Sequence, residues 1–322
     1  MSLKESIKKL QKREHITQDE IVRRLGISLS ALNNSTAEAK DAFQLAFEAA
    51  PTGDSKELEK FLPWVRKFPI RALQNMGHIP ANIKGEDLVR AVFRFMQIGS
   101  IKGFNNYYGA TLQSTNPQTY AAWIRLGELR VERSTTEYTP DREAILSNLK
   151  FLRTNVFFHG QSLRKVIREV LNNCGIELVE VEPFLTAPIP TSAFYWRGYQ
   201  PVIQIPTSKM DDAKLLEAVF HAAGHLLYHP LRTTCLQTGT VKNDSATAPS
   251  PLETDAEAFA QDMLLSEAEE CELICCGRFS ERRCIQHFSG LFHVRPSILV
   301  TRLQQQGKIK LSSPLNDFKI AV

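Results

Sequence analysis

The sequence predicts an α+β fold: an all-helical N-terminal region, then a small sheet with one long helix, then a helical C-terminal part. Apolar residues recur with the helical period in most segments up to residue 152. The pattern then changes to alternation at 176–181 and to a hairpin pattern around Arg197-Gly198. Strands followed by a helix in this order indicate an α+β unit rather than a parallel α/β repeat.

Composition and charge limit the class of protein. The chain has 322 residues, of which 43% are hydrophobic and 23% charged, enough for two or three domains. A net charge of +4 is too weak by itself to indicate nucleic-acid binding. No apolar stretch approaches the roughly 18 residues of a membrane span, and residues 1–12 lack the apolar core of a signal peptide. We therefore expect a cytoplasmic protein with no membrane partner.

The six cysteines fit a reducing compartment. No C-x-x-C pair occurs, which argues against a structural zinc knuckle. We expect reduced and mostly buried thiols. Nothing in the sequence supports a redox role for Cys235 or for the Cys275-Cys276 pair.

Residues 1–36 have the pattern of a helix-turn-helix segment. Thr17 can cap a first helix, Gly26 ends that helix in a tight turn, and Ser28 can cap a second helix. This arrangement is typical of DNA-binding proteins. It also suits a helical packing or protein-docking module, so both functions remain open for this segment.

The net charge of the same segment is relevant to DNA binding. Residues 1–24, Arg24 included, carry three more basic than acidic side chains, which would help contact with phosphates. The second helix offers Ser28, Ser30 and Asn33 as candidate DNA-binding residues. It has no Arg or Lys that could read a guanine edge, so the prediction depends on shape and a modest charge.

The chain is expected to continue as helices and then to form the sheet unit. Helical segments are predicted at 37–76, 86–98, 120–131, 142–152, 163–171, 252–265 and 281–309. Strands are predicted at 176–181, 194–199 and 201–205. Residues 133–140 are the predicted linker. The expected division is a helix-turn-helix-like segment 1–36, a helical region 37–140, a domain 141–270 around two histidines, and a helical, helix-turn-helix-like part 271–322.

The two histidines lie on a long helix that Ser208 to Asp211 would open as a capping box. His221 and His225 are four residues apart, so both imidazoles project from one face. That geometry presents two nitrogens to one cation, at about 2.0–2.1 Å each for zinc. In zinc peptidases a glutamate follows the first histidine and takes a proton from the attacking water. Ala222 stands there, so the pattern indicates a metal site without its general base.

Glu253 is the candidate third ligand, at the start of the helix predicted over 252–265. It also completes a capping box with Ser250 and Pro251, and the sequence leaves capping and metal binding open. Glu257 lies one turn later on the same face. It is the candidate carboxylate that would orient a histidine N–H.

These residues carry a resemblance to a known family. The segment FHAAGHLLYH, residues 220–229, resembles the H-E-x-G-H-hydrophobic-hydrophobic-x-H segment of the ImmA/IrrE metallopeptidases. The segment ETDAEAFA, residues 253–260, is similar to the third-ligand helix of that family, E-x-x-A-[ND]-x-F-A. Residues 64–69 and 122–128 look like segments upstream of the peptidase in fusions with an antitoxin-type helix-turn-helix, so the resemblance covers about residues 60–310.

The resemblance implies a minimal zincin fold, in which a small, mostly antiparallel sheet packs on the active-site helix. It implies Zn²⁺ as the cofactor, with His221, His225 and Glu253 as its ligands. It also implies an endopeptidase that cleaves a regulator protein, often a repressor, in a stress, prophage or defence pathway. The strand 202–205, with Val202 and Gln204, is then a candidate edge for an extended peptide substrate.

The chain departs from the family pattern at two positions. Glu257 stands where Asn or Asp is more usual, and Ala222 replaces the catalytic glutamate. Loss of a general base typically costs about 10²–10⁴ in rate, so we predict an enzyme that is inactive or nearly so. Deliberate replacement and natural loss both explain Ala222, and the intact pattern around it favours replacement. The alternative function is a non-enzymatic DNA-binding transcriptional regulator or antitoxin with a pseudopeptidase domain.

The residue that would stabilise a transition state is left open by the sequence. Tyr228, His229 and His287 are candidates because they are polar and close in sequence or in the expected fold. His229 could equally cap the end of its helix.

Overall fold

The computed structural model describes residues 2–48, 58–131, 139–154, 162–229, 234–238 and 251–322. Its class is α+β, as predicted, with helices and a small four-stranded mixed sheet. The chain forms two compact units. The first comprises Met1–Glu137, Val181–Ile189 and Arg197–Tyr199, and the second comprises Tyr138–Glu180, Pro190–Trp196 and Gln200–Val322.

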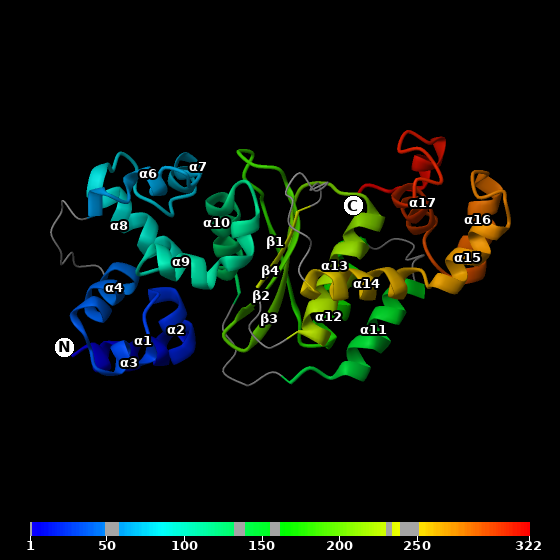
Figure 1. The fold of residues 1–322 in the computed structure, drawn as a ribbon. Helices are drawn as coiled ribbons and strands as arrows, with labels where there is room; N and C mark the ends of the chain where they lie inside the picture. Colours follow the sequence, from blue (N-terminus) through cyan, green and yellow to red (C-terminus); the bar gives the residue numbers. More distant parts are fainter. Residues whose placement is uncertain (1, 49–57, 132–138, 155–161, 230–233, 239–250) are drawn as a thin grey trace. The chain divides into compact units, whose positions relative to one another are not determined.

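The first unit is helical (Figure 1). Its helices are α1 (Leu3–Glu14), α2 (Gln18–Leu25), α3 (Leu29–Asn33), α4 (Ala37–Phe47), α6 (Leu62–Val65), α7 (Ile70–Asn75), α8 (Gly85–Met96), α9 (Ile101–Tyr107), the 3₁₀ helix η1 (Gly109–Gln113) and α10 (Pro117–Glu128). The predicted helices at 86–98 and 120–131 correspond to α8 and α10. The helical stretch predicted over 37–76 is divided into α4, α6 and α7, and residues 49–57 within it lie outside the described residues.

The predicted helix-turn-helix is present in α2 and α3. Oγ1 of Thr17 accepts a hydrogen bond from the backbone N–H of Glu20, and Oγ of Ser28 accepts one from that of Ala31. Gly26 ends α2 with a φ of 74°, in the left-handed region that favours glycine. The local sequence signals therefore determine where both helices begin and where the first one ends.

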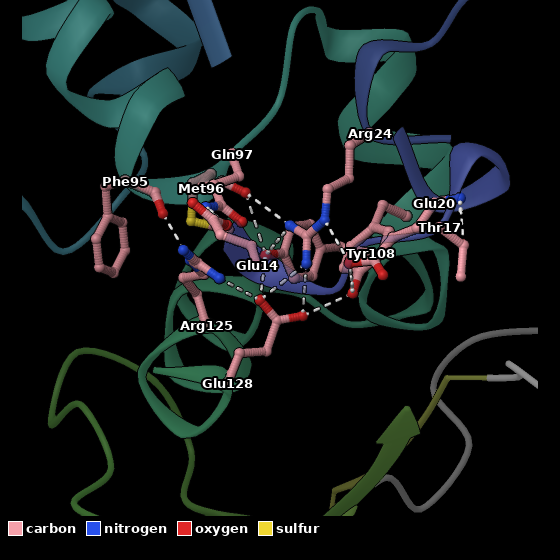
Figure 2. A network of polar contacts seen from close by, with 11 residues as sticks. Glu14, Thr17, Glu20, Arg24, Phe95, Met96, Gln97, Tyr108, Arg125 and Glu128 are labelled. Carbon is pink, nitrogen blue, oxygen red and sulfur yellow. Dashed lines mark hydrogen bonds and ion pairs between the residues drawn. The ribbon is translucent and has the colours of Figure 1, made fainter. Parts of the chain in front are cut away.

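Arg24 on α2 is completely buried and lies in a network of polar contacts (Figure 2). Its Nε donates to Glu20 at 3.0 Å and its Nη2 donates to Glu128 at 3.0 Å. Glu128 also accepts from Nη1 of Arg125 at 2.7 Å and from the hydroxyl of Tyr107 at 2.8 Å. Burial alone would raise the pKa of Glu128, but Arg24 and Arg125 outweigh it and hold that pKa well below its usual range.

This network removes Arg24 from the positive charge that could contact DNA. The expectation that Arg24 helps contact with phosphates is wrong, because its guanidinium is buried and paired inside the first unit. The backbones of α2 and α9 also approach closely, since a Cβ added to Gly103 would lie 2.0 Å from the carbonyl oxygen of Arg24. The helix-turn-helix segment is therefore packed into the helical region and is not a separate module joined by a linker.

The sheet has the strand order β1-β3-β2-β4. Its strands are β1 (Glu177–Val181), β2 (Pro190–Arg197), β3 (Gln200–Pro206) and β4 (Cys235–Thr238). The predicted strand at 176–181 and the hairpin around Arg197-Gly198 are confirmed. β4 was not predicted; it pairs antiparallel with β2, and Cys235 lies opposite Phe194.

Helices α11–α14 gather beside the sheet (Figure 1). The helices of the second unit are α11 (Arg142–Thr154), α12 (Leu163–Asn173), α13 (Asp212–Tyr228), α14 (Pro251–Leu264), α15 (Glu267–Cys275), α16 (Arg282–Phe292), α17 (Pro296–Gln305) and the 3₁₀ helix η2 (Pro314–Phe318). α13 packs against β3 and along α14. The capping box expected at Ser208 is wrong, because Asp211 caps α13 by accepting the N–H of Lys214 at 2.9 Å.

The start of α13 is held by the C-terminal region. The buried carboxylate of Asp212 accepts hydrogen bonds from Arg295 at 3.0 Å, from the hydroxyl of Ser297 at 2.8 Å and from the N–H of Ile320 at 3.0 Å. The stretch predicted over 281–309 comprises α16, a short turn and α17. Within the described ranges, no helix combines the length and the apolar character that a membrane span requires.

Candidate metal centre

Three side chains on α13 and α14 bring their ligand atoms together. Nε2 of His221 lies 3.0 Å from Nε2 of His225 and 3.1 Å from Oε2 of Glu253. Nε2 of His225 lies 3.5 Å from Oε1 of Glu253. Ligand atoms at about 2.0–2.1 Å from a tetrahedral metal ion stand about 3.3 Å apart. This group could therefore hold a metal ion with little rearrangement.

The two helices supply these ligands because they pack unusually closely. His221 and His225 occupy successive turns of α13 and share one face. Between them, a Cβ added to Gly224 would lie 3.0 Å from Cα of Ala256 and 3.1 Å from the ring of Phe259. The missing Cβ at Gly224 allows α14 to approach, and one turn before Ala256 that helix carries Glu253.

Both imidazoles make a further contact through their other ring nitrogen. Nδ1 of His221 lies 3.2 Å from Oε2 of Glu257, and Oε1 of Glu257 accepts from Nε2 of Gln261 at 2.7 Å. Nδ1 of His225 lies 2.7 Å from Nδ1 of His229 and 3.2 Å from Sγ of Cys235. A partner on Nδ1 fixes the imidazole orientation and leaves Nε2 to face the centre of the site.

The electrostatics of these side chains favour a positive charge at the centre of the group. Burial alone would lower the pKa of His221, but its hydrogen bonds to Glu253 and Glu257 raise it to about 9. Burial alone would raise the pKa of Glu253, but His221 and His225 lower it to about 2. A carboxylate that stays ionised beside two imidazoles is suited to binding a divalent cation.

Ala222 lies beside this group, at the wall of a small pocket. The described residues that line the pocket are Ser192, Ala193, Phe194, His221, Ala222, His225, Cys235 and Gln237. They come from β2, β4 and α13. Ala222 therefore borders the same pocket as both histidines.

Two predicted substrate-binding residues are not among the described residues that line this pocket. Val202 and Gln204 lie on β3, which has β1 on one side and β2 on the other, so it offers no free edge. Both side chains are fully buried, and Oε1 of Gln204 accepts from the hydroxyl of Tyr195 at 2.9 Å. The prediction that this strand is an exposed edge is wrong, because strand order depends on pairings distant in sequence.

Two candidates for transition-state stabilisation do not line the pocket either. The hydroxyl of Tyr228 accepts from Nη2 of Arg142 at 2.9 Å, and its ring contacts Phe259. His287 lies on α16 and packs against Phe288. Neither Tyr228 nor His287 is among the described residues of the pocket wall.

The candidate DNA-binding side chains make local contacts in the first unit. Ser28 caps α3, Oγ of Ser30 accepts from Nδ2 of Asn34 at 3.3 Å, and Oδ1 of Asn33 accepts from Nε2 of Gln18 at 2.8 Å. All three lie near the surface. The capping box expected at Ser250 lies outside the described residues.

Cys235 is a site residue that the sequence pattern does not reveal. It is buried, lines the pocket and contacts His225. Its strand has only four residues and therefore no periodicity that would reveal it.

Comparison with known proteins found no match. No family model, no curated protein and no solved structure matches the chain. The resemblance to the ImmA/IrrE metallopeptidases therefore stays a prediction that rests on the residues quoted for it.

Proposed function

We propose that this chain is a zinc-dependent endopeptidase with a zincin-like domain of the ImmA/IrrE kind, lacking its general base. The observation that carries the proposal is the spacing of 3.0–3.5 Å among the ligand atoms of His221, His225 and Glu253. Two imidazoles and one carboxylate are a ligand set that catalytic zinc uses. Both histidines line a small pocket whose wall also includes Ala222.

Each residue has a defined part in this proposal. His221 and His225 bind the ion through Nε2, and Glu253 binds it through its carboxylate. Glu257 and His229 accept from the two Nδ1–H groups and hold the rings in place. Zinc, when bound, supplies a Lewis acid that polarises a peptide carbonyl and makes a water molecule more acidic. The methyl group of Ala222 cannot accept the proton of that water.

The substrate in this proposal is an extended segment of a regulator protein, such as a repressor, in the cytoplasm. β4 replaces β3 as the strand against which it would lie. Among the described strands β4 is at one end of the sheet, and its residues Cys235 and Gln237 border the pocket beside Ala222. An edge strand offers unpaired backbone groups to an extended peptide.

The test compares Ala222→Glu with Ala222→Gln, which has nearly the same size and no basic carboxylate. The chain as it stands should bind one zinc ion, measured by elemental analysis after dialysis. Ala222→Glu should cleave members of a proteome-derived peptide library about 10²–10⁴ times faster than Ala222→Gln. Equal rates for the two variants, or a chain that retains no zinc, would contradict the proposal.

A second candidate function is a DNA-binding regulator, which the helix-turn-helix geometry of α2 and α3 favours. The surface of this segment has less positive charge than the sequence suggests, because Arg24 is buried. A mobility-shift assay against the operator region of its own gene discriminates the two functions. Sequence-specific binding that weakens with salt supports the regulator, and equal binding to unrelated DNA counts against it.

A further inference from the structure

The second unit contains a pair of thiols outside the metal centre. Cys276 follows the end of α15, and Cys284 lies in the first turn of α16. Their Sγ atoms are 3.2 Å apart. A disulfide bond joins sulfur atoms at about 2.05 Å, so the two thiols need to approach by little more than one ångström. Cys275, although adjacent in sequence to Cys276, is not the partner that the fold provides.

The turn between the two helices holds these thiols together. Gly277 has a φ of 69°, in the left-handed region, and its N–H donates to the carbonyl of Ile274 at the end of α15. The backbone N–H of Arg278 donates to Sγ of Cys276 at 3.4 Å, and Sγ of Cys276 donates to the carbonyl of Leu273 at 2.9 Å. Backbone contacts therefore hold the sulfur of Cys276 in place beside that of Cys284.

The surroundings also distinguish the two thiols. Cys276 is exposed to solvent, whereas Cys284 is partly buried. Burial and the neighbouring thiol of Cys276 raise the pKa of Cys284 to about 12. An exposed thiol with a backbone donor to its sulfur is the better one to react with a dissolved oxidant.

We propose that Cys276 and Cys284 are a redox-active dithiol, which a peroxide converts to an intramolecular disulfide. The thiolate of Cys276 attacks one peroxide oxygen, so that a sulfur–oxygen bond forms, the oxygen–oxygen bond breaks, and the leaving oxygen takes a proton. Cys284 then attacks the sulfenic sulfur of Cys276, forming the sulfur–sulfur bond and releasing hydroxide, which takes the proton of Cys284 and leaves as water. Two thiols lose two electrons, and the peroxide gains them.

The disulfide would close the turn between α15 and α16. α15 is fixed at its other end, because Glu270 pairs with Arg302 on α17 and Arg302 also donates to the carbonyl of Gln261 on α14. Oxidation would therefore join α15 and α16 covalently beside these contacts. This site is independent of the proposed peptidase activity, because its chemistry needs neither zinc nor a general base.

The experiment exposes the folded full-length protein to hydrogen peroxide, alkylates the remaining thiols and identifies linked peptides by mass spectrometry. We expect a reversible Cys276–Cys284 link, cleaved again by dithiothreitol. Cys275→Ser, the control with an exposed neighbouring cysteine, should form the link at an unchanged rate. Cys284→Ser should stop at a sulfenic acid on Cys276 that dimedone traps, and Cys276→Ser should give neither product.

Three results would overturn the proposal. The first is a disulfide that involves Cys275 or Cys271 in place of Cys276. The second is a disulfide that forms only between two molecules. The third is that all four thiols of this region stay reduced after excess peroxide. Circular dichroism of each serine variant shows whether it is folded, and dimedone labelling of Cys284→Ser provides a second readout if Cys276→Ser does not fold.

Discussion

Oε2 of Glu253 lies 3.1 Å from Nε2 of His221, although 32 residues separate them in sequence and they come from different helices. In the metal-free protein this contact is an ion pair, because the pKa of His221 is raised to about 9 and that of Glu253 is lowered to about 2. A proton on His221 thus takes the place that a metal ion would have between the two side chains.

The first prediction follows from that proton. At pH 7 His221 is protonated in the metal-free protein, but a zinc ligand must be neutral, so zinc binding should release about one proton from it. The number released should fall towards zero as the pH rises through about 9, since the folded protein then loses the proton before zinc arrives.

Isothermal titration calorimetry at pH 7 checks this prediction in two buffers that differ in ionisation enthalpy. The apparent binding enthalpies should differ by that buffer difference multiplied by the protons released. A binding enthalpy that is the same in both buffers would show that His221 is neutral before zinc binds.

The second prediction concerns Glu257, which accepts from Nδ1 of His221 in the arrangement proposed for the zinc-bound site. Glu257→Gln should keep the fold and lower zinc affinity by about 10–100-fold, as for other groups that orient a metal ligand. Asp262→Asn changes an exposed carboxylate on the same helix and should leave the affinity unchanged. Competition with a chromogenic chelator measures both variants, and equal affinities would remove Glu257 from the site.

The third prediction concerns the approach of α14 to α13 at Gly224. A methyl group there would meet Cα of Ala256 at 3.0 Å, so Gly224→Ala should push the helices apart by a few tenths of an ångström. We expect a loss of about 1–3 kcal/mol in the free energy of unfolding, together with weaker zinc binding.

Gly290→Ala is the matched control, since Gly290 lies in α16 with no atom within 4 Å of an added Cβ. It should stabilise the protein by up to about 1 kcal/mol, because alanine favours the helix. Urea unfolding of the metal-free proteins compares them. If Gly224→Ala is as stable as its parent and binds zinc equally, the close approach is not what positions Glu253.

The candidate metal centre could be predicted largely from local rules, since His221 and His225 share a face through helical spacing alone. Glu253 needed a resemblance, because nothing within its own helix separates a ligand from a capping residue. The helix boundaries at Thr17, Gly26 and Ser28 followed from caps, which act over three or four residues. The capping box of Ser266 and Glu269, with which α15 begins, is a local signal of the same kind.

Other features depend on contacts between distant parts of the chain and could not be read in this way. The position of β3 inside the sheet follows from its pairing with β1, and β4 is too short to have a pattern. Arg24 has the local sequence of an exposed residue on a charged helix. Its burial depends on Glu128, which is 104 residues away.

The last prediction tests that buried arginine. Arg24→Met should destabilise the protein by about 3–5 kcal/mol, because Glu128 and Glu20 would lose a cation inside the first unit. Arg13→Met removes an exposed arginine whose partner is its neighbour Glu14, and it should change stability by no more than about 0.5 kcal/mol. The double variant Arg24→Met/Glu20→Gln should recover part of the loss, since it removes one of the two carboxylates that lose this cation, while Glu128 keeps its ion pair with Arg125. Chemical unfolding followed by tryptophan fluorescence measures all three. If Arg24→Met is no more destabilising than Arg13→Met, the network does not hold α2 in the first unit, and the helix-turn-helix segment is free to act as a separate module.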